Sequence, residues 1–371
     1  MSAASAQMPP LKIGILLAFT GESQILGQEM NDAIATFMQE HGDTVAGRKV
    51  VIVKRDTGGP LPDVAQRQMQ DLVVNEKVDI VIGPDYTPTT AAIKQISTQS
   101  KKPVLVVTAA TTGIIDDAPY MVHFGFSQRQ YEVPLAAWAA KNGLKSIFAL
   151  YANFSPGLDG LKTFRESYTA AGGKMAGEVG FPLNTTDFSA YAQRVKDANP
   201  DALWVFLVPG PQPGLLLRAL RAVGAIGPGT SMKILDNGSI EDEPNLDNVG
   251  DDAIGVISSY LYSDAHNSRI NRAFVDRFER IDPKFRPDYI AAIGYDALGA
   301  VYRVAAAQGG NLDPDRTIAL LKGMKFESPR GPIEIDAKTR TATQNIYIRR
   351  TERRGAHLVN VEIETSPMVK Q

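Results

Sequence analysis

The stretch Lys12-Ile13-Gly14-Ile15-Leu16-Leu17, followed by Phe19-Thr20-Gly21-Glu22-Ser23, decides the fold of this chain. The first run is rich in β-branched and other apolar residues, which favour a buried strand. The second run is a loop, and after it apolar residues recur at helical spacing between Met30 and Met38. A strand, a loop and a helix in this order predict an α/β unit.

Similar units recur along most of the 371 residues. The later strand candidates are mostly continuous apolar runs, as expected for parallel strands that helices cover on both faces. These candidates are Val50–Val53, Asp79–Ile82, Val104–Val107, Ile147–Leu150, Leu203–Leu207 and Met232–Leu235. The pattern restarts after Pro119–Phe126, which predicts two doubly wound parallel sheets in two lobes. The late helical stretches Ser268–Arg280 and Tyr289–Ala306 need a sheet to cover, so several crossings should join the lobes.

Composition excludes several classes of protein. Hydrophobic residues make up 44% and charged residues 22% of the chain, which is ordinary for a globular protein. The net charge is −2 and no run of Lys and Arg occurs, so we expect no nucleic-acid partner. The chain has no Cys, which excludes disulfides and thiolate chemistry and suits an oxidising compartment.

The first seven residues, Met1-Ser2-Ala3-Ala4-Ser5-Ala6-Gln7, lack the charged and apolar regions of an export signal. We interpret them as the start of a mature periplasmic protein whose export signal is absent. The alternative is a cytosolic protein with a flexible N-terminus.

Catalytic and metal-binding motifs are absent from the sequence. The four histidines, His41, His123, His266 and His357, have no metal-ligand spacing. No nucleophile elbow, Walker loop or dinucleotide fingerprint occurs. Isolated carboxylates such as Asp85 more often cap helices than act in catalysis. We therefore expect no enzymatic activity, no catalytic residues, no metal and no cofactor.

Several strand candidates lead instead into helix starts that suit an anion. Thr87-Pro88 follows one strand, with Thr87 as the expected N-cap and Pro88 in the first turn. Ser155-Pro156 and Gln212-Pro213 repeat the pattern, and Ala109-Ala110-Thr111-Thr112 adds a turn with hydroxyl groups. Free N–H groups at such termini bind carboxylates, although each pattern alone is also ordinary helix capping. Apolar walls of the same site would come from Phe19, Leu26, Tyr86 and Phe154.

These features resemble the branched-chain-amino-acid-type periplasmic binding proteins of ABC transporters. The resemblance runs from about residue 11 to about residue 365 and includes Ile82-Gly83-Pro84, Ser155-Pro156-Gly157 and Gly294-Tyr295-Asp296-Ala297. Two segments, His41–Gly47 and Glu327–Pro332, are similar to one branch of the family, whose members bind aromatic acids such as hydroxybenzoates. We therefore expect the type I periplasmic binding protein fold.

The resemblance implies two lobes joined by three hinge crossings, near 123–127, 254–258 and 332–335. The N-terminal lobe would comprise 11–124 and 257–332, and the C-terminal lobe 125–256 and 333–365. Residues 1–10 and 366–371 would be flexible termini. A small-molecule carboxylate would bind in the cleft, the lobes would close, and the closed monomer would dock on an ABC permease in the inner membrane.

Family positions transfer to this chain one at a time. The carboxylate-holding turn corresponds to Thr87 with Ala109, Ala110 and Thr111, and Leu26 packs against the ligand. On the second lobe the loops at 154–156, 210–212 and 236–239 face the ligand. Combined with the apolar walls, this gives the predicted ligand-binding residues: Leu26, Tyr86, Thr87, Ala109, Ala110, Thr111, Phe154, Ser155, Gly210, Pro211, Asp236, Asn237, Gly238 and Tyr289.

One departure from the family pattern bears on the ligand. Amino-acid binders of the family carry an acidic residue that neutralises the ligand ammonium, and Gly238 aligns with it here. A buried ammonium without a partner is costly, so a carboxylate ligand without an amine fits better. An aromatic acid, a hydroxybenzoate or a phenylpropanoid, is the favoured ligand. Two alternatives stay open: an amino-acid binder in which Asp236 replaces the missing carboxylate, and a periplasmic sensor domain of the same fold.

Overall fold

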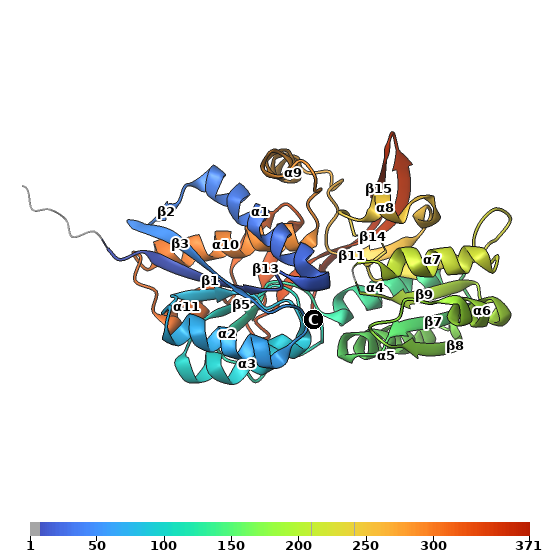
Figure 1. The fold of residues 1–371 in the computed structure, drawn as a ribbon, viewed down its shortest axis with the longest axis horizontal. Helices are drawn as coiled ribbons and strands as arrows, with labels where there is room; N and C mark the ends of the chain where they lie inside the picture. The colour runs from blue at the N-terminus through green and yellow to red at the C-terminus, as the bar shows by residue number, and fades with distance from the viewer. Residues whose placement is uncertain (1–7, 209, 241) are drawn as a thin grey trace, which may run out of the picture.

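The computed structural model describes residues 8–208, 210–240 and 242–371. Figure 1 shows two lobes side by side, each built around a twisted sheet with helices on both faces. The blue N-terminal strands and the orange late helices share one lobe, while the green and yellow middle of the chain forms the other. The predicted segment Met1–Gln7 lies outside the described residues.

The first lobe contains a six-stranded sheet. In spatial order its strands are β2 (Thr44–Val45), β3 (Arg48–Asp56), β1 (Leu11–Leu17), β4 (Ile80–Ile82), β5 (Val104–Val106) and β6 (Met121–His123). All pairs are parallel except β2 with β3. Because Ile13 and Ile15 pack on one face of β1 and Leu16 on the other, the strand is buried on both sides.

Helices from both ends of the chain cover this sheet. They are η1 (Gly21–Ser23), α1 (Gln24–His41), α2 (Pro62–Val74), α3 (Thr87–Ser100), α9 (Arg269–Ile281), α10 (Tyr289–Ala307) and α11 (Pro314–Leu321). Met30 and Phe37 of α1 share a core with Val301 of α10, which is why the late helices join the first lobe. By length and composition α10 could cross a membrane, but 72% of its apolar window is buried within the protein.

The second lobe contains a nine-stranded sheet that is parallel at one end and antiparallel at the other. Its parallel strands, in spatial order, are β8 (Lys174–Phe181), β7 (Ser146–Ala152), β9 (Ala202–Phe206), β10 (Lys233–Asp236) and β11 (Ile257–Tyr260). The antiparallel strands are β14 (Ala342–Arg354), β13 (Gly331–Ile335), β12 (Lys325–Ser328) and β15 (His357–Val369). The second-lobe helices are α4 (Gln128–Lys141), α5 (Ser155–Ala170), α6 (Ser189–Ala198), α7 (Gln212–Ala222), α8 (Leu246–Val249) and η2 (Asp251–Ala253).

Both sheets have the same doubly wound order. The first runs β3-β1-β4-β5 and the second β8-β7-β9-β10. In each sheet the order in which strands are added therefore reverses beside the first strand, β1 or β7. In such sheets ligands bind outside the carboxyl ends of the strands at that reversal. The two predicted doubly wound lobes are present, and their topology places a candidate site where the two reversals face each other.

The lobe boundaries at 256/257 and 332/333 stay a prediction, because pairing and packing divide the chain differently. Strands β11, β12 and β13 pair within the second sheet. Tyr260, Ile333 and Ile335 nevertheless pack in the core of the first lobe. The expected flexible C-terminus differs from the structure, since 366–369 are the end of β15 and pair with β14.

Candidate functional site

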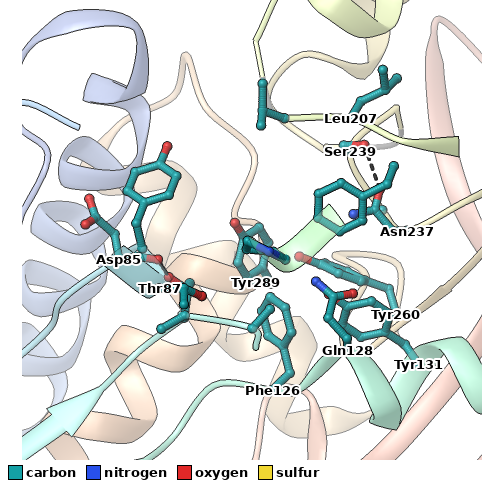
Figure 2. A pocket seen from close by; sticks show the side chains of 18 of the residues that line it. Asp85, Thr87, Phe126, Gln128, Tyr131, Leu207, Asn237, Ser239, Tyr260 and Tyr289 are labelled. Atoms are coloured by element: carbon teal, nitrogen blue, oxygen red, sulfur yellow. Dashed lines mark hydrogen bonds between the residues drawn. The ribbon is translucent and has the colours of Figure 1, made fainter. Parts of the chain in front are cut away.

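A cavity with about 690 Å³ of empty volume, partly open to solvent, lies between the two lobes. Its first-lobe side consists of loops after β1, β4 and β5, and its second-lobe side of loops after β7, β9 and β10. Figure 2 shows the side chains from both lobes directed toward one space.

Nine of the predicted ligand-binding residues line this cavity. They are Leu26, Tyr86, Thr87, Ala109, Ala110, Phe154, Asn237, Gly238 and Tyr289. All but Tyr289 follow a parallel strand directly or open the next helix, which is why the strand pattern located them. That these residues bind the ligand remains a prediction.

Thr111, Ser155, Gly210, Pro211 and Asp236 are predicted site residues that do not line the cavity. Thr111 lies behind the wall, with its Oγ1 3.1 Å from the Oγ1 of Thr87. Ser155 and Pro211 are exposed to solvent. Gly210 lines a separate hollow beside α1, together with Phe19, which was predicted as a wall residue.

The Asp236 carboxylate is directed into its own loop. It accepts hydrogen bonds from the backbone N–H groups of Gly238 at 2.9 Å and Ile240 at 2.8 Å, and from the Ser239 hydroxyl at 3.1 Å. The side chain is fully buried, and these bonds hold the loop that carries Asn237 and Gly238. Asp236 is therefore a structural residue of this loop, and the interpretation that it replaces a missing ammonium partner loses its geometric basis.

The first-lobe side of the cavity offers hydrogen-bond donors. Thr87 is the first residue of α3 rather than its N-cap, because Tyr86 occupies the cap position and the Thr89 hydroxyl accepts from the Tyr86 N–H at 3.2 Å. N–H groups in the first turn of a helix have no partner within that helix, and the helix dipole adds positive potential there. Ala109 adopts a φ of 66°, in the left-handed region that residues other than glycine rarely adopt.

The remaining walls are aromatic and apolar. Phe126, Tyr131, Tyr260 and Tyr289 form a continuous cluster, with ring centroids 5.2 Å apart for Phe126 and Tyr131 and 5.1 Å apart for Tyr260 and Tyr289. From the second lobe, Phe154 and Phe206 meet edge to face at 5.9 Å. Pro156, Leu207 and Val208 complete that side. Such surfaces suit a flat ring.

Gly238 lies directly against the Tyr260 ring. Its φ is +101°, and a Cβ atom at this position would come within 2.8 Å of two ring carbons of Tyr260. An acidic side chain therefore does not fit here unless Tyr260 moves. The position that the resemblance aligns with the acid of amino-acid binders therefore lies against an aromatic ring.

Two carboxyl groups, those of Asp85 and Asp242, also line the cavity, and burial raises the pKa of both. Burial raises the pKa of Asp85 to about 7, although its carboxylate accepts from the Ala18 N–H at 2.8 Å. Burial also raises the pKa of Asp242, a second-lobe residue within hydrogen-bond reach of Asp288 at the start of α10. Burial and, after it, repulsion by Glu29 also raise the pKa of Asp288.

The two lobes already touch across the cavity. The backbone N–H of Thr112 in the first lobe donates to the Asp159 carboxylate of α5 at 2.9 Å. The N–H of Gln128, at the start of α4, donates to the carbonyl of Ala110 at 2.7 Å. Contacts from both lobes around one space permit a ligand to stabilise the closed arrangement.

Pro156 and Ser239 line the cavity within the loops 154–156 and 236–239, which were expected to face the ligand. Sequence reasoning missed the other lining residues, which come from first-lobe loops, the crossings and the second lobe: Asp85, Thr108, Phe126, Gln128, Tyr131, Phe206, Leu207, Val208, Asp242 and Tyr260. A closer reading of 123–131, which was already identified as a crossing, could have found Phe126, Gln128 and Tyr131. Within the described ranges no group of three or more His, Asp or Glu side chains could hold a metal ion.

Comparison with known proteins decides the family. A sequence profile described as periplasmic binding protein matches residues 10–356. The chain belongs to this family. A curated relative, Leu/Ile/Val-binding protein homolog 6 of Brucella abortus, is 31% identical to this periplasmic binding protein. The match covers 98% of the chain described here and 94% of the relative.

Solved structures agree with this family assignment, and with the predicted type I periplasmic binding protein fold, over nearly the whole length of the chain. An ABC-transporter solute-binding protein from Rhodopseudomonas palustris BisB5, in complex with 3,4-dihydroxybenzoic acid, is 38% identical, with a TM-score of 0.92 over 98% of both chains. A second from R. palustris, in complex with 4-hydroxybenzoate, is 33% identical, with a TM-score of 0.93 and the same coverage. The periplasmic binding protein described here is an ABC-transporter solute-binding protein, and its family and these relatives are binding proteins rather than enzymes.

Proposed function

We propose that this protein captures a small aromatic carboxylate, such as a hydroxybenzoate or a phenylpropanoid, in the periplasm and delivers it to an ABC importer. The carboxylate binds at the start of α3, near Thr87 and the turn at Ala109 and Ala110. The ring lies between the Phe154–Phe206 wall and the Tyr260–Tyr289 pair. The protein acts as a monomer, and its closed form docks on the permease subunits.

The observation that carries this proposal is the contact between Gly238 and Tyr260. It removes the room for the acid that an α-amino ligand requires and puts a ring face there instead. Donors on the first-lobe side and ring surfaces elsewhere match a molecule with one anionic end and one flat apolar end. The two R. palustris relatives at 33–38% identity, whose ligands are hydroxylated benzoic acids, support the same ligand class.

A second candidate function, amino-acid binding, is favoured by one observation. The Asp242 carboxyl group lines the cavity and, if ionised, could pair with a ligand ammonium. Against this, Asp242 already accepts from the Asn245 side chain at 3.0 Å, and burial raises its pKa, which opposes the ionised form that an ammonium needs.

Isothermal titration calorimetry with benzoate, the hydroxybenzoates, cinnamates, leucine, isoleucine and valine tests the proposal. We expect submicromolar to micromolar binding of at least one aromatic acid, which corresponds to about −8 kcal/mol or better. The amino acids should not bind at millimolar concentration. Tight binding of an amino acid, with no heat from any aromatic acid, would refute the proposal.

A further inference from the structure

Gln128 is a buried polar side chain of the cavity that the proposed carboxylate site does not use. It is 0% exposed, lines the cavity at the start of α4, and neither its Oε1 nor its Nε2 has a hydrogen-bond partner in the described structure. Leaving a buried amide without partners is costly, so such a group in a ligand site points to a polar atom on the ligand.

The surroundings of Gln128 indicate which kind of atom this is. A Cβ built on Gly160 of α5 would lie 3.1 Å from Gln128 Oε1 and 3.3 Å from Glu132 Oε1, so both oxygens face the same point of α5. Glu132 Oε1 is also buried without a partner, while its Oε2 accepts from the indole of Trp204 at 2.9 Å. The Gln128 amide oxygen can only accept a hydrogen bond, so an anion beside it would not satisfy it.

The amide nitrogen of Gln128 is oriented differently. Figure 2 draws it toward the open space between Phe126 and Tyr289, with the oxygen on the far side. A group that can accept from this nitrogen and still donate a proton to a nearby acceptor satisfies this end of the cavity. A hydroxyl does both, whereas a carboxylate or a hydrogen atom on a ring does not.

We infer that Gln128 is a specificity-determining residue that binds a ring hydroxyl, so that the protein selects hydroxylated aromatic carboxylates over unsubstituted ones. This inference rests on the proposed function and narrows its ligand class. The carboxylate occupies the first-lobe donors, and the hydroxyl occupies the Gln128 end. A ligand without the hydroxyl leaves the amide unpaired, which costs between about 5-fold and about 100-fold in affinity.

Calorimetry with the Gln128→Met variant tests this assignment. The wild-type protein should bind 3- or 4-hydroxybenzoate, whichever is tighter, at least about 5-fold better than benzoate. In Gln128→Met, whose side chain has a similar volume and no amide, this preference should fall to about 2-fold or less while benzoate affinity stays within about 2-fold of wild type. The control is Gln130→Met, because the Gln130 Nε2 already donates to the carbonyl of Ala342 at 2.6 Å. That variant should lower the melting temperature and leave the preference unchanged.

Several results would overturn the inference, and they are distinct from failure of the proposed function. Equal weakening of both ligands in Gln128→Met would place the carboxylate at the amide, and an unchanged preference would show that the amide is satisfied by water. If the variant fails to fold, the wild type decides with 4-methoxybenzoate, which accepts but cannot donate. It should bind more weakly than 4-hydroxybenzoate, and equal affinity contradicts the inference. If no aromatic acid binds the wild type, both proposals fall together.

Discussion

The two sides of the cleft differ in what they offer a ligand. The first-lobe side presents the first-turn N–H groups of α3 and the Thr87 hydroxyl. The second-lobe side presents Phe154, Phe206 and a loop whose glycine, Gly238, lies against Tyr260. In the function proposed above, both sides bind the ligand, and side chains on the second lobe choose its class. This contrast suggests that the anion site is set by the backbone and the ligand class by a few side chains.

The largest expected effect comes from giving the second lobe the acid it lacks. Gly238→Glu forces a side chain into the space of the Tyr260 ring and adds a buried charge. Aromatic-acid affinity should fall at least about 100-fold, measured by calorimetry, because overpacking and an unpaired charge both oppose closure.

The matched control for this variant is Gly229→Glu. Gly229 also has a positive φ, of +82°, but no atom lies within 4 Å of the added Cβ. It should cost about 1 kcal/mol of stability and leave binding intact. A Gly238→Glu protein that keeps its aromatic-acid affinity would break the contrast between the two sides.

A smaller effect should follow from trimming the aromatic wall. Phe154→Ala removes a half-buried ring that lines the cavity, and affinity should fall about tenfold for every aromatic acid because ring contact area is lost. Phe154→Leu, which keeps an apolar surface, should lose about 3-fold. Competition with a fluorescent aromatic acid measures both. Equal affinity for wild type and Phe154→Ala would show that the ring does not rest on the second lobe.

The smallest expected effect concerns pH. Asp242 and Asp288 come from opposite lobes, and burial raises the pKa of both when the lobes meet. The closed form therefore holds more protons than an open form, so affinity should fall a few-fold as pH rises from about 5.5 to about 8. Glu29 and Glu243 add negative charge beside the pair, and Arg349 offsets part of it.

The Asp242→Asn variant removes the titrating group and keeps its shape. Calorimetry across the same pH range should give a flatter profile for this variant than for wild type. The ligand carboxylate is ionised throughout, so it contributes no slope of its own. Wild-type affinity that rises with pH, or an identical slope in Asp242→Asn, would contradict proton uptake by these two carboxyl groups on closure.

The fold was predictable because its signals are local. Continuous apolar runs such as Ile80–Ile82 predict parallel strands. Helix starts such as Thr87-Pro88 predict the edge of the sheet where a ligand binds. Residues that follow those strands directly, among them Ala109 and Phe154, were found in this way, whereas Asn237 was predicted from the family resemblance. Strand β11 was harder to assign, since it pairs in one lobe while Tyr260 packs in the other.

The rest of the site depends on how the lobes face each other. In the sequence, Tyr131 looks like a core residue of a helix, and Phe126 like a core residue of the segment before it. Only the crossing after β6 brings them to the cavity. Asp242 reads as a surface turn residue, yet it is 5% exposed because α10 of the other lobe covers it. The opposite holds for Asp236. It lies in a loop that was expected to face the ligand, yet its carboxylate accepts hydrogen bonds from the backbone of that same loop.

A crystal structure with a bound aromatic acid tests the central claim most directly. We predict that the ligand carboxylate lies within hydrogen-bond distance of the Thr87 N–H or hydroxyl and of the turn at Ala109 and Ala110, with its ring between Phe154 and Tyr260. A ligand seated the other way, with its carboxylate on the Asn237 loop and its ring on the start of α3, would contradict the account.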